Sequence, residues 1–330
     1  MTAASRRLHA AAFALVMAGT AHAAPSAETM MRLSRAVLKV SALGDGDNLS
    51  IGSAVVIGPD SALTNCHVTR QAHTIVLSRG MDRHKVVGQR ADMSRDLCLL
   101  RTAQPLPYPA VDIRAARTLA PGERVLAHGY SGGMEAQFAR GTVIDLHAAG
   151  GSHIIQTTAG FLRGASGGGL FDEAGHLVGI TTFLTAARRP EYFAVPADWA
   201  ERLRERPEAP PAPLSGAALW AQLPAHQPWF MRVLEPLARQ DWAAVARLAD
   251  DWMAAEPHAP AGALMCSRAA YALDDTARRE TCLARALAAA REDEIELLRI
   301  AAWARSMGLQ DALVAATSAL ARIRPIPRGE

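Results

Sequence analysis

The feature that most limits the fold is an abrupt change of pattern at a proline-rich stretch, residues 207–213 (PEAPPAP). Before it, from about residue 37 to 193, short apolar runs such as SAVVI (53–57) and LVGI (177–180) alternate with Gly, Asp, Pro and Ser, which is typical of an all-β barrel or sandwich. After it, Ala, Leu, Arg and acidic residues dominate, and the apolar positions have helical spacing. The 330 residues therefore divide into an all-β domain and an all-α domain.

The first residues have the pattern of an export signal. A positively charged start and a short apolar run lead to an A-x-A site at residues 21–23, so we expect a signal peptide over 1–23, cleaved near Ala23. The alternative is a buried N-terminal helix. We expect the β domain over 24–203, the linker over 204–216 and the helical domain over 217–330. The mature protein would be periplasmic or secreted.

Charge and hydropathy exclude two classes of function. The 35 Lys and Arg residues are nearly balanced by 32 Asp and Glu, and no basic block is present, so we expect no nucleic-acid binding. The apolar run of the signal is too short to span a bilayer, and no later stretch is long and apolar enough, so we expect no stable membrane insertion.

The helical half carries a repeat. Helical turns are expected near Asp241, Asp275 and Leu309, each 34 residues from the next, and Pro257 and Pro325 are separated by twice that period. A 34-residue helix-turn-helix period resembles tetratricopeptide repeats (TPR), although most of their usual aromatic and glycine positions are missing. A plain helical bundle is the alternative. A TPR-like array offers a concave surface, so we expect it to bind peptides or a partner protein.

Three short motifs in the β half carry groups that suit nucleophilic catalysis: LTNCHV around His67, RDLCLL around Asp96 and GASGG around Ser166. A serine hydroxyl needs an imidazole to take its proton and a carboxylate to orient that imidazole. Asp92 is a rival for the carboxylate, but an apolar strand directly follows Asp96. The alternatives to catalytic roles are that His67 is an ordinary core histidine and that Ser166 lies in a simple turn.

The residues around Ser166 are unusually small: RGASGGGLF spans 163–171. A carbonyl under attack develops negative charge, which backbone N–H groups stabilise when no side chain blocks their approach. We therefore expect an oxyanion hole formed by the N–H groups of Gly164 and Ser166.

Taken together, these motifs resemble trypsin-like serine proteases of the HtrA (Deg) type over roughly residues 36–199. The resemblance rests on GSAVVI (52–57), LTNCHV (63–68), DLCLL (96–100), QTTA (156–159), RGASGG (163–168), LVGI (177–180) and FAVP (193–196), in the family's order. It implies a chymotrypsin-like pair of six-stranded β-barrels and peptide-bond hydrolysis through an acyl-enzyme. It also implies roles for His67 as general base, Asp96 as its orienting partner and Ser166 as nucleophile, with no metal or cofactor.

The chain departs from the family pattern in three ways. Ala165 stands where many trypsin-like enzymes carry the Asp of zymogen activation, and Gly169 replaces a proline, which should loosen the loop. The helical half occupies the place of the family's PDZ modules. The segment 159–163, which lines the family's primary pocket, has no acidic residue, so we expect no preference for Lys or Arg.

Four cysteines in an exported protein favour disulfides. Cys266 and Cys282 are equidistant from the turn at residue 274, so they would face each other across a helical hairpin. Cys66 and Cys98 lie beside His67 and Asp96 in sequence, and a triad would bring them together. Buried free thiols are the alternative for both pairs, and a Cys-His metal site is a further one for Cys66 and Cys98.

The sequence thus predicts an exported serine endopeptidase that acts on proteins or peptides. The main rival is an inactive or gated binding or sensor protein on the same scaffold, and an esterase is a third interpretation.

Overall fold

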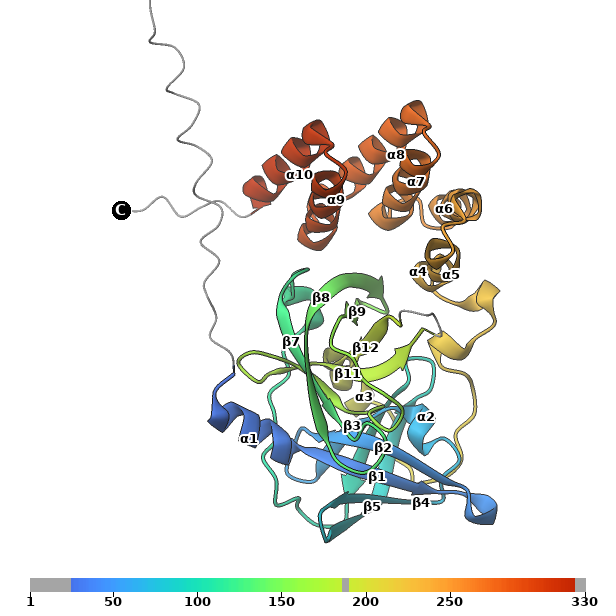
Figure 1. Cartoon of the computed structure of the whole chain (residues 1–330). Helices are drawn as coiled ribbons and strands as arrows, with labels where there is room; N and C mark the ends of the chain where they lie inside the picture. The colour runs from blue at the N-terminus through green and yellow to red at the C-terminus, as the bar shows by residue number, and fades with distance from the viewer. Residues whose placement is uncertain (1–24, 186–189, 324–330) are drawn as a thin grey trace, which may run out of the picture.

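The computed structural model describes residues 25–185 and 190–323 (Figure 1). It contains two β-barrels followed by an array of helices that lies over the second barrel. The predicted signal peptide, residues 1–23, and Pro325 lie outside the described residues.

Each barrel is closed by six antiparallel strands, as expected. The first has the order β1-β2-β3-β6-β5-β4, and the second repeats this connectivity as β7-β8-β9-β12-β11-β10. The strands of the first barrel are β1 (Val37–Leu43), β2 (Leu49–Val56), β3 (Ser61–Thr64), β4 (Thr74–Arg79), β5 (Asp82–Asp92) and β6 (Leu97–Thr102). Those of the second are β7 (Arg124–Gly129), β8 (Gln137–Ala149), β9 (Ser152–Thr157), β10 (Gly169–Asp172), β11 (Leu177–Leu184) and β12 (Tyr192–Pro196).

The alternation of side chains along the strands produces three layers of apolar packing. On β1, Leu38 and Val40 point into the first barrel, whereas Val37 faces the layer between the barrels. On β7, Val125 points into the second barrel and Leu126 faces the same middle layer. Successive side chains of a strand point to opposite faces, so one strand can serve two cores. The middle layer fixes one barrel against the other.

Short helices join these strands. Helix α1 (Ala27–Ala36) precedes the first barrel, α2 (Cys66–Thr69) follows β3, and α3 (Ala200–Arg204) follows β12 through a 3-10 turn. Helix α1 is capped by the hydroxyl of Ser26, which accepts a hydrogen bond from the N–H of Thr29.

The proline-rich linker lies along the first barrel. Ala209 exchanges main-chain hydrogen bonds with Gln89 of β5, and Glu208 forms an ion pair with Arg101 of β6. Farther on, the N–H of Leu214 donates to the carbonyl of Arg70 at 2.7 Å. The chain therefore reaches the helical domain by way of the barrel surface.

The helical domain repeats one chain reversal at the predicted interval. Its helices are α4 (Trp229–Arg232), α5 (Leu234–Ala238), α6 (Trp242–Ala255), α7 (Pro260–Ala272), α8 (Thr276–Ala289), α9 (Glu294–Ser306) and α10 (Gln310–Ile323). Gln240, Asp274 and Gly308, 34 residues apart, have φ of 56°, 57° and 68°. After each, the next N–H donates to the carbonyl five residues earlier, as in a Schellman motif. Helices α6, α8 and α10 begin directly beyond these turns.

Buried polar contacts join the helical domain to the second barrel. Arg299 of α9 contacts Asp145 of β8 at 2.6 Å and also pairs with Glu296. Nearby, the ring of His147 stacks on Phe230 of α4 with centroids 4.2 Å apart. Because His147 is buried, its pKa is lowered to about 4.

The four cysteines form two disulfides. Cys66 of α2 is bonded to Cys98 of β6, and Cys266 of α7 is bonded to Cys282 of α8. The second bond crosses the helical hairpin whose turn is at Asp274, as the sequence symmetry predicted. None of the helices in the described ranges is long and apolar enough to cross a membrane.

Candidate active site

Two turns of the first barrel bring His67 and Asp96 into contact. His67 lies on α2, directly after β3, and Asp96 is the last residue before β6, with a φ of 54°. The Asp96 carboxylate accepts from His67 twice: Oδ2 lies 2.6 Å from Nδ1 of the ring, and Oδ1 accepts the main-chain N–H at 2.8 Å. Asn65 holds the turn by donating its amide to the carbonyl of Asp96. Asp96 is fully buried.

The rival carboxylate, Asp92, has a different task. It accepts hydrogen bonds from the hydroxyl of Ser94 and the guanidinium of Arg95, and it pairs with Arg206 of the linker. Burial alone would raise the pKa of Asp92, but these hydrogen bonds hold it below its ordinary value. Asp92 therefore stabilises the β5–β6 turn and its contact with the linker. The carboxylate that contacts His67 is that of Asp96.

The Ser166 loop, between β9 and β10, uses glycine where no other residue fits. Gly164 and Gly167 have φ of 94° and 87°. A Cβ on Gly164 would lie 2.4 Å from the carbonyl oxygen of Tyr130, and one on Gly167 would lie 2.0 Å from that of Ser53. The small residues thus permit a tight loop that lies directly against both barrels.

Some backbone donors of this loop are bonded and others are free. The N–H groups of Ala165, Gly167 and Gly168 donate to carbonyls within the second barrel. In the part of the chain that the structure describes, the N–H groups of Gly164 and Ser166 have no acceptor. The carbonyl of the preceding peptide bond accepts from Gly132, which turns the Gly164 N–H the opposite way because the peptide is planar and trans. Both predicted donors are therefore free to bind an oxyanion.

Ser53 of β2 is a residue of this site that the sequence did not single out. Its N–H donates to the carbonyl of Ser166 at 2.8 Å, and its hydroxyl donates to that of Gly164 at 2.8 Å. The same hydroxyl accepts from the N–H of Tyr130. One side chain of the first barrel therefore holds the loop of the second. These contacts join segments 111 residues apart, which no local motif signals.

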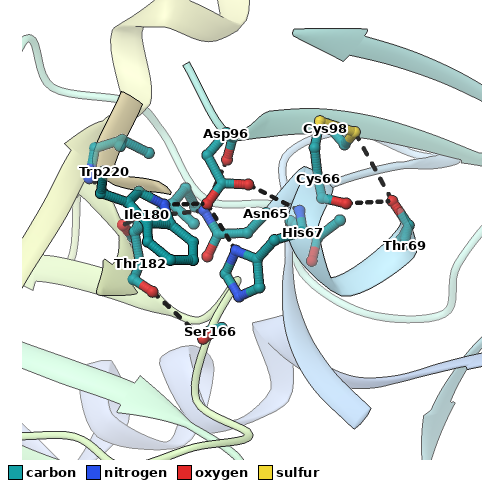
Figure 2. A network of polar contacts seen from close by, with 12 residues as sticks. Asn65, Cys66, His67, Thr69, Asp96, Cys98, Ser166, Ile180, Thr182 and Trp220 are labelled. Atoms are coloured by element: carbon teal, nitrogen blue, oxygen red, sulfur yellow. Dashed lines mark hydrogen bonds and ion pairs between the residues drawn. A yellow bond between two sulfur atoms is a disulfide. The ribbon is translucent and has the colours of Figure 1, made fainter. Parts of the chain in front are cut away.

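The hydroxyl of Ser166 is bonded to the main chain and not to the histidine. Oγ lies 3.4 Å from the carbonyl oxygen of Thr182 on β11, and within the described ranges it makes no hydrogen bond to His67. Figure 2 shows the imidazole pointing toward Ser166. Rotation about the Cα–Cβ bond of Ser166 is the motion that would redirect the hydroxyl.

Trp220 is a second residue that the sequence did not reveal. It follows the linker, and its indole N–H donates to Oδ2 of Asp96 at 2.8 Å (Figure 2). The indole also meets the edge of the His67 ring, with centroids 5.3 Å apart.

The expected loosening at Gly169 is not seen. Gly169 begins β10 and pairs with His128 of β7 on one side and Ile180 of β11 on the other. A Cβ there would lie 2.2 Å from the ring of Phe171, two residues on. The glycine makes room for that buried ring, so the loop after Ser166 is fixed by strand pairing.

The comparisons with known proteins agree with this fold. A family model described as a trypsin-like peptidase domain matches residues 52–180. The periplasmic pH-dependent serine endoprotease DegQ of Escherichia coli is 30% identical over 169 residues, which are 47% of this chain and 37% of DegQ. The solved structure of the HtrA-type protease AlgW with tripeptide has a TM-score of 0.50 and 27% identity, over 55% of this chain and 63% of AlgW. The β half of the chain is a trypsin-like peptidase domain of the HtrA type.

The HtrA-type domain also has relatives of another kind. The anti-sigma-I factor RsgI9 of Acetivibrio thermocellus is 25% identical over 170 residues, which are 51% of this chain and 24% of RsgI9. The chain spans well under half the length of RsgI9 and DegQ. The similarity to these relatives is therefore confined to the HtrA-type domain.

Proposed function

We propose that this protein is a serine endopeptidase in which Ser166 is the nucleophile, His67 the general base and Asp96 its orienting carboxylate. The observation that carries the proposal is the pairing of a buried Asp96–His67 contact with a facing serine whose loop offers two free N–H groups. This is the set of groups that acyl transfer needs.

The reaction follows from these positions. His67 Nε2 takes the proton of the Ser166 hydroxyl while Oγ bonds to the substrate carbonyl carbon, and the N–H groups of Gly164 and Ser166 stabilise the oxyanion. The C–N bond then breaks, and His67 gives the proton to the departing amine. Water repeats the sequence on the acyl-enzyme and releases the acid. Asp96 keeps the proton of His67 on Nδ1 throughout.

Residues 159–163 support a preference for apolar substrate side chains. Phe161 is buried and packs against Tyr192, with ring centroids 5.3 Å apart. A Cβ on Gly160 would touch the ring of Tyr192. The wall before Ser166 is thus aromatic. No carboxylate lies on this segment to pair with Lys or Arg.

We propose the division into a signal peptide (1–23), a protease domain (24–203), a linker (204–216) and a helical domain (217–330). Export to the periplasm is supported by the periplasmic location of DegQ. For the helical domain we propose binding of a protein partner or peptide, supported by its 34-residue repeat.

The proposal is tested with the mature chain from Ala24 and its Ser166→Ala twin. Both are incubated with unfolded casein and with a fluorophosphonate probe that reacts with activated serines. We expect the wild type to label and cleave, and the twin to do neither, with turnover lower by several orders of magnitude.

A gated or inactive binding protein is the second candidate. It is favoured by one observation, the bond of the Ser166 hydroxyl to Thr182 in place of His67. Labelling without casein cleavage would support gating. No labelling of the wild type would refute the endopeptidase and support the binding protein.

A further inference from the structure

We propose that Trp220 is a positioning residue of the triad, supplied by the first residues of the helical domain, directly after the linker. This inference rests on the proposed function and names a residue that acts through Asp96 and His67.

The main contact is a shared acceptor. Oδ2 of Asp96 lies 2.6 Å from Nδ1 of His67 and accepts the indole N–H of Trp220 at 2.8 Å. With the His67 main-chain N–H on Oδ1, three donors fix the carboxylate in its plane. A buried carboxylate needs such donors, because each unsatisfied lone pair is costly away from water. Among the described residues, Trp220 supplies the one donor to this carboxylate that does not come from His67.

The indole also packs against the pair. Its plane is at 88° to the imidazole of His67, and it stacks on Phe183 of β11, with centroids 6.0 Å apart. Figure 2 shows the indole beside the Asp96 carboxylate, on the side away from Cys98. Asp96, which lies beside the indole, is fully buried.

Trp220 is held from both domains. On the barrel side, the neighbouring N–H of Leu219 donates to the carbonyl of Ser94 at 3.0 Å. On the helical side, the side-chain amide of Gln227 donates to the carbonyl of Trp220 at 3.1 Å. Three residues later, Phe230 stacks on His147 of the second barrel. The placement of the indole therefore depends on the docking of the segment that begins the helical domain.

Trp220→Phe in the full mature chain tests the inference, since it keeps an aromatic ring and removes the N–H. The matched control is Trp229→Phe, because Trp229 stacks on Trp252 and has no contact with the triad among the described residues. Rates are divided by the number of sites titrated with the fluorophosphonate, so that a misfolded fraction does not count.

We expect Trp220→Phe to lower kcat per titrated site by roughly 10-fold, with KM within twofold of the wild type. Asp96 then has one fewer donor and faces the imidazolium with more of its charge, so the acid limb of the pH–rate profile should move to higher pH. Asp96 is the charged side chain that contacts His67 in the described structure. Trp229→Phe should behave as the wild type.

A per-site kcat equal to that of the wild type would overturn the inference. An effect confined to KM would also overturn it, because it would show that Trp220 contacts the substrate instead of positioning the triad.

A second measurement does not need activity. In the Ser166→Ala chain, the low-field proton resonance of His67 Nδ1–H should shift or broaden when Trp220 becomes Phe. An unchanged resonance would overturn the inference even if the wild type proves inactive, an outcome that would by itself refute only the proposed endopeptidase.

Discussion

The hydroxyl of Ser53, on the first barrel, donates to the main-chain carbonyl of Gly164, on the second, at 2.8 Å. Ser53→Ala removes this bond and leaves both Gly164 and the N–H of Tyr130 without a buried partner. Unmatched buried groups cost about 1–3 kcal/mol each, and here the cost falls on the loop that bears the oxyanion donors. We expect kcat/KM to fall about 10-fold or more, measured by peptide hydrolysis per titrated site.

The control for Ser53→Ala is Ser267→Ala. Ser267 is equally buried and donates to the carbonyl of Arg279 within the helical domain. It should lower the melting temperature and leave kcat/KM unchanged. Equal rates for Ser53→Ala and the wild type would show that the loop holds its shape without this bond.

The disulfide between Cys66 and Cys98 joins the two elements that carry His67 and Asp96. Replacing both cysteines by Ala should lower the free energy of unfolding by about 2–4 kcal/mol. It should also lower kcat, because α2 and the start of β6 lose their covalent link. Denaturant unfolding and active-site titration measure the two effects. The double Ala variant of Cys266 and Cys282 should lose stability alone, and similar losses of kcat in both variants would contradict a local role.

Asp145 compensates the buried charge of Arg299 across the domain interface. Among the described residues, Asp145→Ala leaves that buried guanidinium with Glu296 as its ion-pair partner, and loss of a partner from a buried charge costs up to about 3–5 kcal/mol. We expect an early thermal transition as the helical domain separates from the second barrel. Asp250→Ala removes an exposed partner of Arg278 and should cost about 1 kcal/mol or less. A single, unshifted transition for Asp145→Ala would refute the coupling.

His147 makes stability depend on pH. Burial lowers its pKa to about 4 from an ordinary 6.5, although Asp145 beside it acts in the opposite direction. The unfolded chain takes up this proton near pH 6.5 and the folded chain only near 4. Stability is therefore full above pH 6.5 and falls as the pH is lowered toward 4. Burial also lowers the pKa of His128 to about 4, so it adds in the same direction.

Melting temperatures across pH 7 to 4.5 test this dependence. His147→Gln should flatten the slope by the equivalent of about one proton. The exposed His258, replaced in the same way, should leave it unchanged. A variant that kept the full slope would assign the effect to other groups.

Sequence reasoning found what local motifs encode. His67, Asp96 and Ser166 each lie in a short stretch whose residue types reflect their immediate backbone, and the repeat was visible because Asp241, Asp275 and Leu309 recur at a fixed interval. The facing of Cys266 and Cys282 followed from the symmetry of a hairpin. Ser53 and Trp220 could not be found in this way. Their contacts with the site join residues 111 and 124 apart, and a serine on a strand or a tryptophan after a linker has many other uses.

The recurrence of one chain reversal at Gln240, Asp274 and Gly308 makes the helical domain modular in length. Each 34-residue unit ends in the same backbone geometry with which the next begins, so a copy of residues 275–308 inserted after Gly308 would meet a compatible end. The contacts with the second barrel and with Asp96 come from units before that point. The helical array could therefore be lengthened by whole 34-residue units without changing its contacts with the second barrel or with Asp96.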